Sequence, residues 1–296
     1  MRARAPGKVV LSGAYSVLEG APAIVAAVDR YVVADSSRTG DFLTEEVKAA
    51  GLTTPIWFDA TALRHDDRKL GLGSSSAILV ATLAAQALEQ LGSMSPEQLA
   101  STVFPRALAA HRTAQSGGSG IDVTAACFGG ILEFHRGADL PRHGTLPKLP
   151  HLHLEVWASS HAASTQTMLE RVRAYADSHP AGYRDAIRAQ ADAATATLQA
   201  WRLADCAAIV RSCIAQRHAL ERLGVDVGIP IVTEQVAALA DFAEQHGAAV
   251  LPAGAGGGDI ALYVGLASCD FMHDELPRHE QCRLPLALGA AGVHAA

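Results

Sequence analysis

Apolar residues alternate between short and long runs along this chain of 296 residues. Short, partly β-branched runs bounded by turn residues predict strands at residues 8–11, 23–34, 56–58, 152–158, 248–251 and 260–265. Longer alanine-rich or amphipathic runs predict helices at residues 78–91, 96–115, 165–178, 183–222 and 233–246, with a helical turn at 43–50. The chain is therefore predicted to mix strands with helices, and an apolar stretch ending at Phe134 is left unassigned.

Helix boundaries have their clearest signal at Ser95. This residue is placed to cap a helix, Pro96 takes the first helical position and Gln98 completes a capping box. Within the same helix, Pro105 lacks a backbone N–H and is expected to kink or split it. The long helical run at 183–222 is expected to break near Arg202.

The segment 137–150 contains several prolines and predicts a domain boundary. It divides the chain into a domain of residues 1–150 and a domain of residues 151–296. A length of 296 residues suits either one large domain or two of ordinary size.

Net charge and hydropathy limit the classes of partner. A net charge of −6 argues against a general nucleic-acid binder, which would carry a basic patch. No run approaches the roughly 18 apolar residues that a bilayer span requires. Residues 9–11 are too short to form the apolar part of a signal peptide, although basic residues precede them. We expect a cytoplasmic protein without a nucleic-acid or membrane partner.

The five cysteines are scattered and no two form a CxxC pair. They predict neither a disulfide framework nor a zinc site. Cys206 and Cys213 are one heptad apart in a helical stretch and are expected to be small core residues. The thirteen histidines are dispersed along the chain as well.

The segment at 69–77 combines two glycines and three serines directly before a predicted helix. Glycines let backbone approach a ligand closely, and the start of a helix offers unpaired N–H groups and a positive dipole end. This combination predicts a phosphate site, with a plain turn as the alternative. The spacing fits neither a P-loop nor a G-x-G-x-x-G dinucleotide site.

Four further segments could contribute to chemistry, and three of them have a plain alternative. Lys8 supplies a cation near the first strand but could be a solvated surface group. Asp122 follows a flexible turn and could simply cap a helix. Residues 253–259 contain more glycine than a turn needs, which suggests backbone packed against a ligand or another loop. Residues 163–165 could be an ordinary Ser/Thr helix cap.

The order of these segments resembles that of the GHMP kinase superfamily. Pro-Gly-Lys at 6–8 with Gly13 and residues 20–23, then residues 71–77, then the glycines of 254–258 are similar to its three signatures. The resemblance spans nearly the whole chain. It implies an α+β fold of two domains, the first like ribosomal protein S5 domain 2 and the second ferredoxin-like, with ATP in the cleft between them.

Within the superfamily, the sequence is most similar to the phosphomevalonate kinase family. The stretch Gly-Ala-Tyr-Ser-Val-Leu-Glu-Gly at 13–20 resembles that family's first motif. His111 and the residues 118–123, Gly-Ser-Gly-Ile-Asp-Val, resemble its segment ending Gly-Ser-Gly-Phe-Asp-Val. Residues 163–165 and Asp259, which follows the last glycine run, also match that family. Many relatives have Glu as a second magnesium ligand at the position of His111, whereas phosphomevalonate kinases tend to have His.

The resemblance implies transfer of the ATP γ-phosphoryl group to phosphomevalonate, which gives diphosphomevalonate in the mevalonate route to isoprenoids. ATP and Mg²⁺ would be required. The implied site residues are Lys8 and Asp122 for catalysis; Gly71, Leu72, Gly73, Ser74, Ser75 and Ser76 for ATP phosphates, with Ser75 as the metal ligand; and Tyr15, His111, Arg112, Ser119, Gly120, Ser164, Thr165, Gly254, Ala255, Gly256, Gly257, Gly258 and Asp259 for substrate.

The type of acceptor determines what Asp122 would do. An alcohol must lose a proton during attack, whereas a phosphate monoester has a second pKa near 6 and is already mostly dianionic. A phosphomevalonate kinase therefore needs cations such as Lys8 and Arg112 more than a base. The alternatives are a mevalonate kinase, a diphosphomevalonate decarboxylase of the same fold, and a GHMP-like binding protein without turnover. A homodimer is left open.

Overall fold

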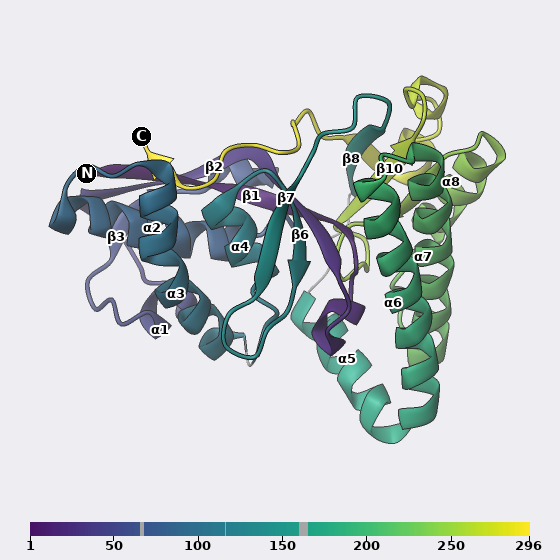
Figure 1. Cartoon of the computed structure of the whole chain (residues 1–296), viewed down its shortest axis with the longest axis horizontal. Coiled ribbons are helices and arrows are strands. Elements are labelled where there is room, and N and C mark those ends of the chain that lie inside the picture. Colours follow the sequence, from purple (N-terminus) through teal and green to yellow (C-terminus); the bar gives the residue numbers. More distant parts are fainter. Residues whose placement is uncertain (66–67, 116, 160–164) are drawn as a thin grey trace. The chain divides into compact units, whose positions relative to one another are not determined.

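The computed structural model describes residues 1–65, 68–115, 117–159 and 165–296 (Figure 1). The chain forms two compact units. The first unit comprises residues 1–9, 25–145 and 286–296, and the second comprises residues 10–24 and 146–285. This division differs from the predicted one at residue 150, because residues 10–24 belong to the second unit and the last eleven residues return to the first.

The first unit is built on a six-stranded sheet. Its central order is β12-β1-β2-β6-β7, and β3 pairs with β2. The strands are β1 (Arg2–Ser12), β2 (Ala23–Thr39), β3 (Ile56–Asp59), β6 (Ile131–His135), β7 (Arg142–Leu146) and β12 (His294–Ala295). The short strands β4 (Arg64–His65) and β5 (Arg68–Lys69) pair with each other just before the glycine-serine loop.

Helices of the first unit gather beside this sheet (Figure 1). They are α1 (Glu45–Ala49), α2 (Ser74–Leu91), α3 (Pro96–Ala114) and α4 (Ile121–Phe128), with a 3-10 turn at Thr61–Leu63. Helix α2 is buried over most of its length, since its alanines allow close packing against α3 and α4. The capping box of Ser95 and Gln98 is confirmed. Helix α3 continues through Pro105, so the helix is not split there, and a kink at this residue stays a prediction.

The second unit contains a four-stranded sheet of order β11-β8-β10-β9. Its strands are β8 (His153–Ser159), β9 (Ala249–Pro252), β10 (Ile260–Gly265) and β11 (Gln281–Arg283). All three neighbouring pairs are antiparallel. The unit also includes a 3-10 helix, η1 (Ser16–Glu19), and two short 3-10 turns, η3 (Asp270–Met272) and η4 (Pro277–His279).

Four helices complete the second unit, and α6, α7 and α8 lie side by side in Figure 1. They are α5 (Thr165–Ser178), α6 (Pro180–Arg202), α7 (Cys206–Val227) and α8 (Glu234–Gln245). The expected break near Arg202 is confirmed, because Asp205 starts a new helix as its cap. The antiparallel sheets and their helices confirm the α+β class.

Two local expectations differ from the structure. The predicted linker 137–150 contains β7, a strand of the first sheet. Cys213 is buried as expected, but Cys206 is partly exposed because it starts α7 instead of lying inside the helix. All five cysteines are free thiols.

No single helix among the described residues combines the length and the apolar character that a membrane span requires. Helices α2 and α3 meet the length and composition test only when taken together, and they are bent by 115° at the break between them.

Candidate active site

Strand β1 brings Lys8 against the glycine-serine loop. The Lys8 backbone N–H donates to the carbonyl oxygen of Leu72 at 2.8 Å, and the residue is only 9% exposed. Gly73 follows with a φ of +74°, and a Cβ atom there would lie 2.9 Å from Lys8 Cγ and 3.0 Å from Cε. Glycine is therefore required at Gly73 for its backbone conformation and for the passage of the lysine side chain. Two predicted motifs that are far apart in sequence meet here.

The glycine-serine loop ends at the start of α2. The first helical hydrogen bond runs from the Ala77 N–H to the Gly73 carbonyl, at 3.1 Å. The N–H groups of Ser74, Ser75 and Ser76 precede this bond, and Gly73 provides no side-chain cap. Ser74 and Ser75 are partly exposed. Such a turn attracts anions through its N–H groups and the helix dipole.

Asp122 lies in the first turn of α4, where it faces Lys8. Lys8 Nζ is 3.5 Å from Asp122 Oδ1, and the two side chains are 11% and 27% exposed. Gly120 is the helix cap, so the plain interpretation of Asp122 as a cap is wrong. The structure thus unites the two predicted catalytic residues beside the predicted phosphate loop.

His111 comes from α3 and contacts the same helix start. Its Nδ1 lies 3.4 Å from Ser76 Oγ, and the residue is buried. Burial holds the pKa of His111 below its usual 6.5, although the carboxylates of Asp122 and Glu46 act in the opposite direction. The imidazole is therefore neutral at physiological pH. A neutral, buried imidazole thus contacts the serine hydroxyl at the start of α2.

Protonation of His111 should couple stability to pH. The unfolded chain binds a proton at this residue near pH 6.5, whereas the folded chain binds it only at lower pH because its pKa is lowered. The free energy of unfolding should consequently fall as pH drops below about 6.5 and level off only below the folded pKa. Urea unfolding of the wild type and of His111→Asn at about pH 7.5 and about pH 5.5 measures this effect.

The His111→Asn variant should lose part of the pH dependence. An exposed histidine, His153, offers the matched replacement His153→Asn, which should leave the dependence unchanged. If the free energy of unfolding depended equally on pH in the wild type and in His111→Asn, the lowered pKa assigned to His111 would be contradicted.

Arg112 and Ser119 hold backbone in this structure. The Arg112 guanidinium donates to the carbonyl oxygens of residues 137–139 at 2.7 to 3.0 Å. The Ser119 hydroxyl accepts from the Ile121 N–H at 3.3 Å, directly before Asp122. Both residues therefore shape the loops that flank His111 and Asp122.

Sequence reasoning missed Glu46, a buried carboxylate in α1. Gln115 Nε2 donates to its Oε1 at 2.8 Å, and Glu46 acts electrostatically on His111. No motif marks this residue. The burial of Glu46 and its polar partner Gln115 are visible only in the structure.

In the second unit, the glycine-rich segment 253–259 contacts Tyr15. The Tyr15 hydroxyl donates to the Ala255 carbonyl at 2.6 Å, and the tyrosine has an unusual φ of 60°. Burial raises the pKa of Tyr15. Gly256 has a φ of +76°, and a Cβ there would lie 2.1 Å from the Ile231 carbonyl oxygen. Close packing against protein backbone thus explains why residue 256 is glycine. The hydrogen bond from Tyr15 joins this turn to the predicted motif at 13–20.

The remaining predicted substrate residues lie in the second unit too. Gly254, Gly257 and Gly258 have positive φ angles. The Asp259 carbonyl accepts from the Ser159 N–H at 3.1 Å, which joins the loop to β8. Thr165 is exposed at the start of α5, and Ser164 lies outside the described residues.

A magnesium ion would find few protein ligands beside this loop. Mg²⁺ prefers oxygen and is commonly held by one or two protein groups together with substrate phosphates and water. The partly exposed Ser75 hydroxyl suits that pattern. His111 does not, because its ring offers only nitrogen as a ligand. The donor set fits an ion that arrives with a nucleotide.

Comparison with known proteins agrees with this arrangement. Residues 60–130 match the family described as GHMP kinases N terminal domain, which includes the glycine-serine loop, His111 and Asp122. This part of the chain is therefore similar to the N-terminal domain of GHMP kinases.

Individual proteins are similar to this chain over different shares of its length. A phosphomevalonate kinase of a Streptomyces species is 29% identical, over 97% of this chain and 96% of its own. A mevalonate kinase of Thermococcus sibiricus is 28% identical over 58% of this chain and 61% of its own. The structure of Streptococcus pneumoniae phosphomevalonate kinase in complex with phosphomevalonate and AMPPNP has a TM-score of 0.79 at 14% identity, with 97% of this chain and 99% of that chain covered. The fold is therefore that of GHMP kinases.

Proposed function

We propose that this protein is a Mg·ATP-dependent kinase that phosphorylates phosphomevalonate. The observation that carries the proposal is the contact of Lys8 with both the glycine-serine loop and Asp122. Full-length similarity to a phosphomevalonate kinase supports the choice of acceptor. The reaction forms a bond from an acceptor phosphate oxygen to the γ-phosphorus and breaks the bond from that phosphorus to the β,γ-bridging oxygen. Diphosphomevalonate and ADP are the products.

Phosphoryl transfer depends on position and on charge neutralisation. The N–H groups at the start of α2 bind the phosphates of ATP. Lys8 Nζ stabilises the charge that develops on the transferred group. Its aliphatic chain is confined by Gly73, so the ammonium group is held in position before the substrates bind.

Asp122 orients Lys8 in this scheme. The acceptor is already mostly dianionic near neutral pH, and no proton has to be removed from it. A carboxylate 3.5 Å from the ammonium nitrogen fixes the position of the cation. Mg²⁺, bound through the Ser75 hydroxyl, would neutralise phosphate charge.

Replacement of Ser75 tests the metal assignment. Ser75→Ala should raise the Mg²⁺ concentration needed for half-maximal rate by about tenfold, since one of few protein ligands is lost. The measurement is the initial rate at saturating ATP across a magnesium titration. Ser101→Ala, on an exposed position of α3, is the control and should leave the titration unchanged. An unaltered magnesium dependence in Ser75→Ala would contradict the role.

A mevalonate kinase is the second candidate, supported by partial similarity to archaeal mevalonate kinases. A coupled ADP-release assay with phosphomevalonate, mevalonate, homoserine and sugars separates the two. We expect turnover with phosphomevalonate and little with the others. Turnover with mevalonate alone would favour the second candidate. Binding of phosphomevalonate without ADP release would favour a protein that has lost catalysis.

A further inference from the structure

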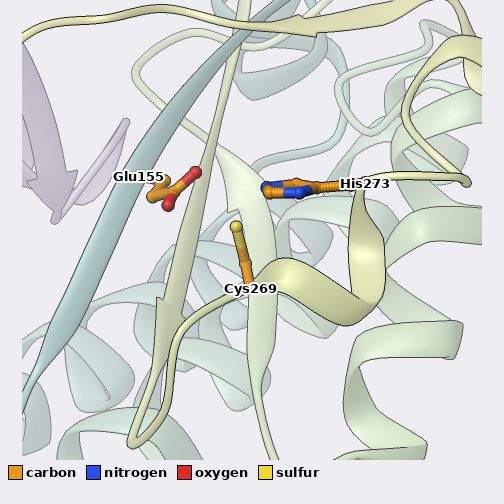
Figure 2. Close-up of side chains that lie close together, drawn as sticks. All are labelled: Glu155, Cys269 and His273. Carbon is orange, nitrogen blue, oxygen red and sulfur yellow. The ribbon is translucent and has the colours of Figure 1, made fainter.

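Three side chains of the second unit that no sequence motif marks converge on one another. Glu155 lies on β8, Cys269 directly precedes the turn η3, and His273 directly follows that turn. Figure 2 shows the carboxylate, the thiol and the imidazole facing one another. One ligand atom from each lies within 4.8 Å of the other two. The ligands of a tetrahedral zinc ion are about 3.3–3.8 Å apart, given its usual bond lengths. The cluster is therefore close to the size of a metal site.

The thiol, the imidazole and the carboxylate together favour some metal ions over others. A thiolate and an imidazole are ligands that Zn²⁺ prefers and that Mg²⁺ and Ca²⁺ avoid. A carboxylate oxygen completes a mixed set of three. Three protein ligands leave a fourth tetrahedral position for water or another small ligand.

Neighbouring groups orient the ligands. Arg283 Nη2 is 2.9 Å from Glu155 Oε1, and Trp157 Nε1 donates to Oε2 at 3.5 Å. Asp270 Oδ1 is 3.8 Å from His273 Nε2. Metal ligands are commonly fixed by such outer partners, which set the carboxylate and the ring in place. Each carboxylate oxygen can accept more than one bond, so these contacts leave Glu155 able to bind a metal.

Exposure provides a route for a metal to enter. Cys269 is fully buried, whereas the side chain of His273 is 44% exposed. An ion can approach from the His273 side and reach a thiol that is otherwise shielded from solvent. The site is thus accessible and still mostly enclosed by protein.

A reactive cysteine is a weaker interpretation of the same cluster. Burial, with the nearby Glu155 carboxylate, raises the pKa of Cys269 to about 12. A thiol in that state is a poor nucleophile. A divalent metal can displace the thiol proton because it replaces the proton's charge at the same sulfur.

We propose that Glu155, Cys269 and His273 form a Zn²⁺ site with one open coordination position. The ion links β8 to the segment around η3, two parts of the second unit that are more than a hundred residues apart in sequence. It therefore stabilises this unit. The proposal shares no residue with the kinase site and holds whichever acceptor the enzyme uses.

Cobalt is a direct probe, because Co²⁺ replaces Zn²⁺ and reports its ligands through absorption. Metal-free full-length protein is titrated with Co²⁺ in the presence of excess Mg²⁺. We expect one equivalent to bind, with visible bands of a tetrahedral ion and a near-ultraviolet band from sulfur-to-cobalt charge transfer. Zn²⁺ should then displace the cobalt and raise the melting temperature.

Variants assign the bands to residues. Cys269→Ser should lose the charge-transfer band, and Cys282→Ser, at an exposed cysteine of β11, should keep it. His273→Gln should weaken Co²⁺ binding by more than the about 10–100-fold that loss of an outer partner costs. Because His273 is partly exposed, this variant should fold even where a buried Cys269→Ser does not.

Three results would overturn the proposal. The first is a wild-type protein that shows no charge-transfer band. The second is a band that persists in folded Cys269→Ser or disappears in Cys282→Ser. The third is a His273→Gln protein that binds Co²⁺ as tightly as the wild type.

Discussion

Replacement of Lys8 by methionine should lower kcat by about 10²–10³-fold, the loss seen when one preorganised donor to a developing charge is removed. Methionine retains an unbranched chain beside Gly73, so packing against the loop changes little. The variant removes the ammonium group that lies 3.5 Å from Asp122 Oδ1. Steady-state rates with ATP and phosphomevalonate measure the effect, and the melting temperature checks the fold.

Lys48 offers a matched control. It is an exposed lysine in an ion pair with Glu45, so Lys48→Met also removes a paired cation. Its kcat should equal that of the wild type, because exposed ion pairs contribute little and Lys48 has no role in the site. Similar losses in Lys8→Met and Lys48→Met would contradict the role of Lys8.

Asp122→Asn separates two kinds of acceptor. With a phosphate acceptor, the loss should stay below the about 10²-fold that removal of a general base costs at minimum. Losses of equal size in Lys8→Met and Asp122→Asn would instead favour an alcohol acceptor, whose proton must be removed. The ratio of the two effects therefore reports on acceptor chemistry without any knowledge of how the acceptor binds.

Gly73→Ala should lower kcat by about 10²-fold, which is the cost of a displacement of about 1 Å at a catalytic group. The new Cβ would lie 2.9 Å from Lys8 Cγ, so the lysine side chain or the loop must move. The positive φ at this position adds about 1–2 kcal/mol of strain to the folded protein. Initial rates and urea unfolding measure the two effects separately.

Gly92 provides the control at the other end of helix α2. It has a φ of +84°, and no atom lies within 4 Å of the site of its missing Cβ. Gly92→Ala should therefore destabilise the protein by about 1–3 kcal/mol and leave kcat unchanged. An active Gly73→Ala enzyme, or an equal loss of kcat in both variants, would contradict the steric argument.

The sequence allowed the phosphate loop to be predicted because its signals are local. Glycines and serines directly before a helix define an anion site within nine residues. The ion pair of Lys8 with Asp122 could not be derived in this way, since 113 residues separate its partners and only the folded chain brings β1 and α4 together. Family resemblance supplied both residues, and the structure supplied their geometry.

Two other features could not be predicted from local sequence patterns, because contacts between distant segments create them. The sequence predicts a linker where β7 lies, because the strand is recognised only by its pairing within the first sheet. The cluster of Glu155, Cys269 and His273 joins a strand to a turn more than a hundred residues later. Cysteine spacing therefore predicted no zinc site.

The identity of the product tests the central proposal most directly. Phosphorus NMR of a reaction with ATP and phosphomevalonate distinguishes a phosphate monoester from a diphosphate. We predict that the monoester signal is replaced by two mutually coupled signals of a diphosphate ester, in step with formation of ADP. An unchanged monoester signal would contradict the proposal, above all if a parallel reaction with mevalonate forms a monoester. ADP formed without a new diphosphate would contradict it as well.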